Sequence, residues 1–222
     1  MKVGTDGVLL GAWARIPTSA QTILDVGTGC GLIALMLAQR TTHASIFGVD
    51  VCERAISDAR VNAQKSPFYL RVFSVRKSIQ QGTLEFEKRG LRFEAIVCNP
   101  PFFSDSLLSP KQQRTIARHQ ESLSLPELFD YSKRLIANDG ILSLILPVEQ
   151  FEPCMRAATS AGFNLSRKTL VRPLPDRPCH RMLLEFLHDK PCKTIEEELL
   201  LETEHHCRSP EFQTLTSNFY LN

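Results

Sequence analysis

The sequence lacks the features that mark membrane-spanning, secreted and repetitive proteins. No run approaches the roughly 20 consecutive apolar residues that carry a helix across a bilayer. The first residues also lack the basic segment, apolar stretch and small-residue cleavage site of a secretory signal. We find no internal repeat, low-complexity tract or linker. We therefore expect a cytoplasmic protein with no membrane association and one domain that spans residues 1–222.

Paired cysteines are absent as well. The seven cysteines are scattered along the chain, and none belongs to a C-x-x-C pair. An odd number without that spacing argues against both a disulfide framework and a zinc ribbon, so we expect reduced, mostly packing residues. His205, His206 and Cys207 are adjacent potential ligands without a second half, and we predict no metal.

A strong charge of either sign is missing too. The 26 Lys and Arg residues nearly balance the 24 Asp and Glu residues, which leaves a net charge of +2. This surplus is too small to establish a nucleic-acid partner. One short stretch is more basic than the rest, and it contains Arg167, Lys168, Arg172, Arg177 and Arg181. Its pattern fits a solvated hairpin and an RNA-facing surface equally well.

What the chain does contain is an alternation of apolar strands with helices. Strand patterns occupy residues 21–27, 44–50, 69–75, 92–99 and 140–147. Helical patterns occupy residues 7–14, 32–40, 52–65 and 151–161, and Ser124 with Glu127 forms the capping box of another helix. Nearly continuous apolar strands predict a parallel sheet buried on both faces, hence a doubly wound α/β fold.

The last quarter of the chain changes character. Two β-like runs at residues 164–174 and 179–187 are separated by "PDRPC", which predicts an antiparallel hairpin at one edge of the sheet. A further strand near residues 197–202 and a final helix near residues 210–221 are expected to complete the fold.

The first strand ends in the glycine loop "LDVGTGCG", in which Gly27, Gly29 and Gly31 alternate with other residues. Ligands of open α/β sheets bind beyond the carboxyl ends of the strands. Glycines let the backbone turn tightly and approach a ligand closely. The spacing differs from the G-x-G-x-x-G of the dinucleotide fingerprint, which favours a smaller nucleoside ligand over a diphosphate.

Asp50 ends the second strand about 20 residues beyond the glycines, where a carboxylate can accept hydrogen bonds from ribose hydroxyls. The alternative is that Asp50 only caps the next helix.

The stretch "EAIVCNPPFF" ends a buried strand in Asn99, two prolines and two aromatic residues. Proline lacks an N–H and fixes its φ angle, so the turn is rigid and exposes carbonyl groups.

Together, "DVGTGCG" and "NPPF" resemble the cofactor loop and the catalytic tetrapeptide of Rossmann-like, S-adenosyl-L-methionine-dependent methyltransferases that act on planar nitrogens. The resemblance implies that the Asn99 side chain and the Pro100 carbonyl accept hydrogen bonds from the target amine, and that Phe102 stacks on the base. The catalytic residues are then expected to be Asn99, Pro100, Pro101 and Phe102.

A narrower resemblance covers nearly the whole chain. "MKVGTDGVLLGAWA", "NPPFF", "QQRTIARHQ", "LSLPELF" and the terminal "FYL" are similar in order to the tRNA1(Val) (adenine-37-N6)-methyltransferase family. It implies N6-methylation of adenosine 37 in the anticodon loop of a bacterial valine tRNA. The cofactor-binding residues that it implies are Lys2, Thr5, Asp25, Gly27, Gly29, Gly31, Asp50, Val51, Ser78 and Asn99, with Asp6 beside Thr5. Capping of the first helix by Thr5 or Asp6 is the alternative.

The resemblance also implies a substrate surface. The RNA-contacting residues are expected to be Phe103, Arg114, Arg118, His119, Arg172 and Arg181. Basic side chains of this kind position RNA through its phosphates without reading its sequence.

Two departures from the family pattern stand out. Relatives begin further upstream, so we expect the chain to lack the family's N-terminal segment. Lys77 and Ser78 stand where relatives often have an aspartate that binds the adenine amine of the cofactor, and Ser78 is a weaker substitute.

Other functions carry the same tetrapeptide. The alternatives are methylation of ribosomal RNA guanine at N2, of DNA adenine or of a protein glutamine, and a non-catalytic RNA-binding module with this fold. We expect a monomer.

Overall fold

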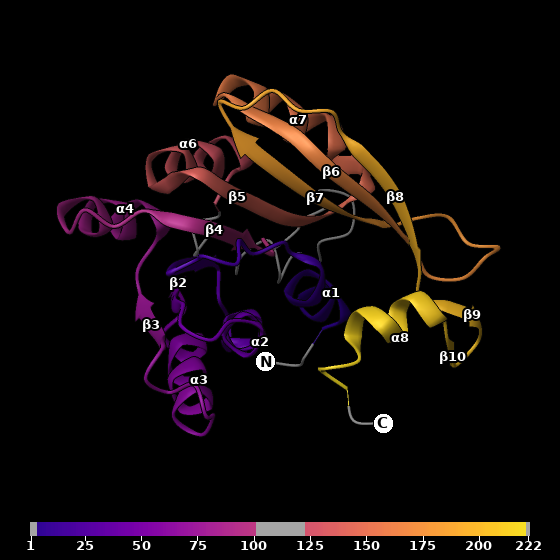
Figure 1. The fold of residues 1–222 in the computed structure, drawn as a ribbon, viewed down its shortest axis with the longest axis horizontal. Coiled ribbons are helices and arrows are strands. Elements are labelled where there is room, and N and C mark those ends of the chain that lie inside the picture. Colours follow the sequence, from indigo (N-terminus) through magenta and orange to yellow (C-terminus); the bar gives the residue numbers. More distant parts are fainter. Residues whose placement is uncertain (1–3, 101–122, 221–222) are drawn as a thin grey trace, which may run out of the picture.

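The computed structural model describes residues 4–100 and 123–220. An eight-stranded sheet runs through it in the strand order β3-β2-β1-β4-β5-β7-β6-β8 (Figure 1). The strands are β1 (Thr22–Val26), β2 (Ser45–Asp50), β3 (Val72–Arg76), β4 (Phe93–Cys98), β5 (Ile136–Pro147), β6 (Phe163–Arg172), β7 (Arg181–His188) and β8 (Ile195–Leu200). A small antiparallel pair, β9 (Glu202–Glu204) and β10 (Cys207–Arg208), follows β8.

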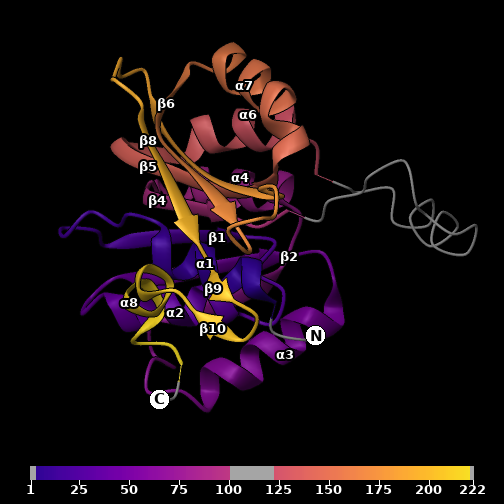
Figure 2. The same cartoon turned by 90° about the vertical axis from the view of Figure 1, so that its right-hand side faces the viewer.

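Helices cover both faces of this sheet (Figures 1 and 2). One apolar cluster joins the sheet to α4 (Ile79–Lys88), α6 (Leu125–Leu135) and α7 (Phe151–Ser160). A second cluster joins the opposite face to α1 (Thr5–Trp13), α2 (Leu32–Arg40), α3 (Glu53–Gln64) and α8 (Pro210–Thr216). A short 3₁₀ helix, η1 (Val148–Gln150), precedes α7. The predicted doubly wound α/β fold is therefore confirmed.

Strand direction decides which ends meet at one edge. Strands β1 to β5 are mutually parallel, so their carboxyl ends share an edge. β7 runs antiparallel to β5, and its first residue, Arg181, pairs with Pro147 at the end of β5. The β6–β7 loop consequently lies at the same edge. The order reverses between β1 and β4, which is the place where α/β sheets bind ligands.

α1 is fastened to β6 and β7 by a buried polar network. Trp13 Nε1 donates to Thr169 Oγ1 over 2.9 Å, and the Arg167 guanidinium lies 3.7 Å from the centre of the Trp13 ring. Just beyond the helix, Arg15 Nη2 donates over 2.6 Å to Glu185, whose side chain is fully buried. A buried carboxylate requires such a partner, because an unpaired charge is costly away from water. The network fixes the first helix against the hairpin.

Most expected elements are present, with several differences. α1 begins at Thr5 rather than Gly7. The final helix stops at Thr216, and the last sheet strand begins at Ile195 and lies outside the hairpin, parallel to β6. α4 was not predicted, although Ser78 and Gln81 form a complete capping box at its start.

Three of the seven cysteines lie in the core. Cys30, Cys98 and Cys154 are buried, whereas Cys52, Cys192 and Cys207 are exposed and Cys179 is intermediate; all seven are free thiols. The expectation that most of them pack in the core is thus wrong, because four of the seven are exposed or only partly buried. In the described part of the chain, no helix is long and apolar enough for a membrane span, and no three His, Cys, Asp or Glu side chains are grouped to hold a metal ion.

Candidate active site

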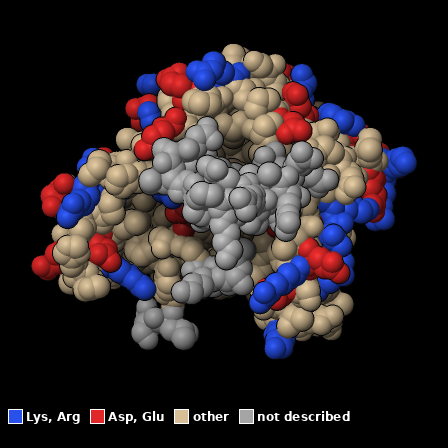
Figure 3. Space-filling model, turned by 180° about the vertical axis from the view of Figure 1, so that it is seen from behind, with Lys and Arg blue, Asp and Glu red and all other residues tan. Residues whose placement is uncertain are grey.

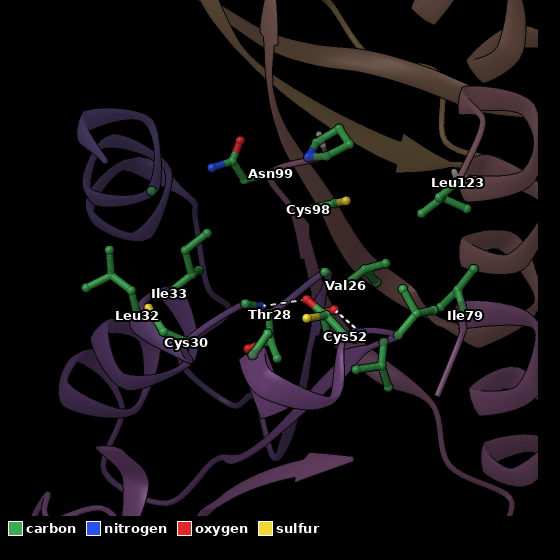
Figure 4. Close-up of a pocket in the computed structure, with 18 of the residues that line it drawn as sticks. Val26, Thr28, Cys30, Leu32, Ile33, Cys52, Ile79, Cys98, Asn99 and Leu123 are labelled. Atoms are coloured by element: carbon green, nitrogen blue, oxygen red, sulfur yellow. Dashed lines mark hydrogen bonds between the residues drawn. The ribbon is translucent and has the colours of Figure 1, made fainter. Parts of the chain in front are cut away.

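A cavity of about 770 Å³ opens at the carboxyl ends of β1, β2, β3 and β4. This volume suits a ligand of drug or nucleoside size. Figure 4 shows its two sides: Leu32 and Ile33 lie on one and Ile79 and Leu123 on the other, with Thr28 and Cys52 between them. Asn99, directly after β4, lies on the rim above.

The glycine loop takes a shape that only glycine adopts without strain. Gly27, Gly29 and Gly31 have φ angles of 72°, 56° and 82°, in the left-handed region. The amides of Gly27 and Thr28 both donate to the carbonyl of Val49, over 2.9 and 3.0 Å. The loop is thereby bonded to the end of β2.

Thr28 packs directly over Gly48 of β2. A Cβ atom at position 48 would lie 2.8 Å from Thr28 Oγ1, which is too close. The Thr28 hydroxyl donates in turn to Asp25 Oδ2 over 2.7 Å. Gly48 therefore makes room for the side chain that connects the loop to β1.

Asp25 lies behind the cavity wall and is fully buried. Burial, with a smaller contribution from the charge of Asp50, raises the pKa of its carboxyl from 3.8 to about 7, against the lowering effect of hydrogen bonds from the Thr28 hydroxyl and the Ala34 amide. Among the described residues Asp25 Oδ1 has no hydrogen-bond partner. Asp25 thus supports the loop from behind and does not line the cavity.

Asp50 connects the glycine loop to α3. Its Oδ2 accepts from the Gly29 amide over 2.9 Å, and its Oδ1 accepts from the Cys52 amide over 2.8 Å. The second bond is made to Cys52, which is itself the N-cap of α3, and no side chain caps this helix, so the capping alternative is wrong. A carboxylate has about four acceptor positions, so capacity remains for hydroxyl donors in the cavity.

Asn99 and Pro100 line the cavity directly after β4. Within the described residues no hydrogen bond occupies the Asn99 side chain. The neighbouring Cys98 thiol is buried, and burial, followed by the charges of Asp25 and Asp50, raises its pKa well above the usual range. A neutral thiol is a poor nucleophile. The described part of the site thus offers amide and carbonyl acceptors.

Three comparisons with known proteins place the chain. A family model of the methyltransferase small domain matches residues 8–145. A tRNA1(Val) (adenine(37)-N6)-methyltransferase of Parabacteroides distasonis is 43% identical over all of this chain and 91% of its own length. Relatives with the same name from Vibrio cholerae and Flavobacterium psychrophilum are 39% and 37% identical, over 89% and 93% of their lengths.

The chain belongs to the tRNA1(Val) (adenine(37)-N6)-methyltransferase family. Solved structures support the fold alone, because they are distant in sequence. A predicted O-methyltransferase from Agrobacterium tumefaciens superposes with a TM-score of 0.74 at 18% identity over 98% of both chains. NSun6 from Pyrococcus horikoshii with SFG has a TM-score of 0.59 at 12% identity over 85% of this chain and 53% of its own. The Rossmann-like architecture of the family member is therefore shared by other methyltransferases.

The structure brings most of the described predicted residues of this family member together. Those that line the cavity are Thr5, Gly27, Gly29, Asp50, Val51, Ser78, Asn99 and Pro100. Gly31 does not: it is the N-cap of α2, and its backbone packs against Ala59. Seven predicted residues lie outside the described ranges: Lys2, Pro101, Phe102, Phe103, Arg114, Arg118 and His119.

Thr5 and Asp6 do not cap α1. The N-cap is Gly4, and no side chain caps this helix end. Both residues line the cavity instead, and Asp6 Oδ2 accepts from Arg181 Nε over 2.9 Å. Arg181 thus reaches the cavity wall from the hairpin. Arg172 lies in a bidentate pair with Glu198, at 2.5 and 3.0 Å.

Charges of both signs surround this edge of the sheet. Figure 3 shows Lys and Arg side chains mixed with Asp and Glu around the visible margin of this face. The ion pairs of Arg172 with Glu198 and of Arg181 with Asp6 place negative charge beside the basic residues of the hairpin.

Sequence reasoning missed several lining residues. Thr28, Val49, Cys52, Gln80 and Leu123 line the cavity and were not predicted. Of these, only Gln80 could have been found from the sequence, because it lies inside the capping-box pattern that starts α4. The others are ordinary residue types whose role depends on where the strands end.

The buried carboxyl of Asp25 predicts a pH dependence of stability. Its pKa is higher in the folded state, so folding favours the protonated form, and this contribution is lost as pH rises from about 4 to about 7. Asp25→Asn keeps the acceptor for Thr28 and removes the titration. Relative to this variant, wild type should lose up to about 1.4 kcal/mol of unfolding free energy per pH unit in that window.

Urea unfolding without ligand at pH 4 to 8 measures this difference. Thr28→Val is the matched control: it removes one of the groups that lower the pKa of Asp25, so the loss should extend to higher pH. Equal pH slopes for wild type and Asp25→Asn would contradict the prediction.

Proposed function

We propose that the protein transfers a methyl group from S-adenosyl-L-methionine to N6 of adenosine 37 in the anticodon loop of a bacterial valine tRNA. The observation that carries this proposal is the identity of 37–43% over the whole chain to relatives that bear this name. The site supports it, because Asn99 lies on the rim of a nucleoside-sized cavity that Asp50 and the glycine loop line.

The residues of the cavity fit this cofactor. Asp50, whose carboxylate is held by two backbone amides, accepts hydrogen bonds from the ribose hydroxyls. The glycine loop lets the ligand approach the backbone closely, and its shape is fixed by the bonds to Val49. When bound, the cofactor supplies a methyl group on a positively charged sulfur, which is a strong electrophile.

Asn99 and Pro100 act on the target amine. The lone pair of an exocyclic adenine nitrogen is delocalised into the ring, which makes it a weak nucleophile. The Asn99 side-chain oxygen and the Pro100 carbonyl accept hydrogen bonds from the two N–H groups and aim the lone pair at the methyl carbon. The prolines keep these acceptors in place, and preorganised dipoles need no rearrangement during the reaction. As the new N–C bond forms, the bond between the methyl carbon and the sulfur breaks and leaves S-adenosyl-L-homocysteine, and the methylated amine then releases one proton to water.

The β6–β7 hairpin is a proposed RNA contact. It lies at the same edge of the sheet as Asn99, because β7 begins opposite the end of β5. Arg172 and Arg181 exchange part of their pairing with Glu198 and Asp6 for contacts with RNA phosphates. Phe103, Arg114, Arg118 and His119 belong to the same proposed surface.

Methylation of unmodified bacterial tRNA tests the proposed function. The protein is incubated with total tRNA and methyl-labelled S-adenosyl-L-methionine, and the digested nucleosides are separated by mass spectrometry. N6-methyladenosine confined to a valine tRNA is expected. Label in guanosine would contradict the proposal, as would cofactor binding without transfer to any tRNA.

Two substitutions separate chemistry from cofactor binding. Asn99→Ala should leave the Kd for the cofactor unchanged and lower kcat by about 10²- to 10³-fold, because it removes a preorganised acceptor. Asp50→Ala should mainly raise the Kd for the cofactor, because it removes the acceptor for the ribose hydroxyls. Calorimetry measures binding and single-turnover methylation measures the chemical step. An unchanged rate for Asn99→Ala would contradict the mechanism.

The hairpin is tested by the salt dependence of tRNA binding. Arg172→Gln and Arg181→Gln should each weaken binding and reduce the slope of log K against log salt by about 1. Glu198→Gln is the matched control, since it frees Arg172 and should strengthen binding. Unchanged slopes in both arginine variants would remove the hairpin from the RNA surface.

A further inference from the structure

The cavity extends beyond Asp50, away from Asn99. Lys77, Ser78, Ile79 and Gln80 line this part, directly after β3. The strands are neighbours in the order β3, β2, β1, β4, so Asp50 at the end of β2 lies between this segment and Asn99. A nucleoside whose ribose contacts Asp50 and whose reactive end points at Asn99 must place its base here.

Apolar side chains in this part suit a planar ring. Val51 is 39% exposed and lines the cavity together with Ile79 and Leu123. Ile79 and Leu123 lie on the same side in Figure 4, opposite Leu32 and Ile33. A purine base between such side chains buries its faces and leaves only its edge to be recognised.

Lys77 and Ser78 are poorly placed to recognise that edge. The Ser78 hydroxyl oxygen accepts from the Gln81 amide over 3.3 Å, and the Ser78 amide donates to Gln81 Oε1 over 3.2 Å. Lys77 forms an ion pair with Glu85 and carries donors only. Lys77 thus offers no acceptor and the Ser78 hydroxyl oxygen already accepts one hydrogen bond, so a side-chain oxygen that is still free is better suited to bind an amine.

Gln80 has a free acceptor whose direction is fixed. Its Nε2 donates to Glu127 Oε1 over 3.3 Å, and none of the described residues donates to its Oε1. Hydrogen bonds from Ser124 lower the pKa of Glu127, which is therefore ionised and can only accept. The amino group of Gln80 must consequently face Glu127, which leaves the oxygen for a ligand.

Glu127 is itself held in place. Its Oε2 accepts from the Ser124 amide over 3.0 Å and from the Ser124 hydroxyl over 2.7 Å, as part of the capping box of α6. The first turn of α6 thus fixes a side chain in the first turn of α4. No other described residue bonds to Gln80 in this way.

We propose that Gln80 Oε1 accepts a hydrogen bond from the exocyclic amine of the cofactor's adenine, and that Glu127 is the positioning residue that keeps this oxygen turned toward the base. The inference rests on the proposed use of S-adenosyl-L-methionine. Gln80 is then a specificity-determining residue. A purine with an amine at position 6 can donate a hydrogen bond to Gln80 Oε1, whereas a purine with a carbonyl oxygen there places two acceptors against each other.

Binding of two product analogues tests the assignment. S-adenosyl-L-homocysteine carries the 6-amine, whereas S-inosyl-L-homocysteine carries a 6-oxo group. Calorimetry on the full chain should show that wild type prefers the adenosyl ligand by at least about tenfold, the usual effect of one such hydrogen bond and an opposed acceptor. Gln80→Met, which is similar in size and lacks the acceptor, should reduce the preference to within about twofold.

Glu127→Gln tests the positioning role. Glutamine at this position keeps the capping box, yet it can donate as well as accept. The Gln80 amide can then turn around, so the preference for the adenosyl ligand should fall while thermal stability stays near that of wild type. A purely structural role of Glu127 would lower the melting temperature and leave the preference unchanged, which contradicts the assignment.

Glu87→Gln is the matched control. It removes the ion pair of Glu87 with Arg134, which also joins α4 to α6 but does not line the cavity, and it should leave the preference intact. Loss of the preference in Glu87→Gln, or its retention in Gln80→Met, would overturn the assignment. Wild type that binds both ligands equally would overturn the assignment and leave the proposed cofactor standing. Wild type that binds neither would overturn both.

Discussion

The hydrogen bond from the Gly29 amide to the Asp50 carboxylate is the interaction on which the rest of the site depends. It joins the loop after β1 to the end of β2, and the Cys52 amide extends the same connection to α3. The bond needs a backbone that turns through the left-handed region and a strand that lets Thr28 pack closely over Gly48. A ligand that contacts Asp50 therefore finds the loop already formed, which reduces the entropy lost on binding.

Helices form the remaining walls of the cavity around Asp50 and the glycine loop. α1 contributes Thr5 and Asp6 to one side of the cavity, and its other end is held by Trp13 against Thr169 and Arg167. α4 and α6 meet on the opposite side through Gln80 and Glu127. Each wall is thus fixed by bonds between segments far apart in the sequence. Reactions that proceed by positioning rather than by a strong acid or base benefit from such rigidity.

The sequence predicted the eight strands of the main sheet, the parallel direction of the first five and the two motifs at their ends, because apolar runs and glycine or proline turns are local signals. It did not predict α4, whose capping box is equally local but whose apolar residues Ile79 and Phe86 are few. It also assigned Asp25 to the cofactor, and it left capping of α1 by Thr5 or Asp6 open as the alternative to their place near the cofactor. Asp25 is buried behind the glycine loop, and the N-cap of α1 is Gly4, with no side-chain cap.

The sequence by itself determined the chemistry that is available: a glycine loop, a carboxylate after β2 and an asparagine followed by two prolines after β4. These signals depend on backbone conformation and spacing, which neighbouring residues specify. Only the tertiary structure decided that Arg181 pairs with Asp6, that Glu127 orients Gln80 and that the hairpin lies at the edge with Asn99. Such contacts join residues tens to hundreds of positions apart, and they form only when strand order and helix packing bring those residues together.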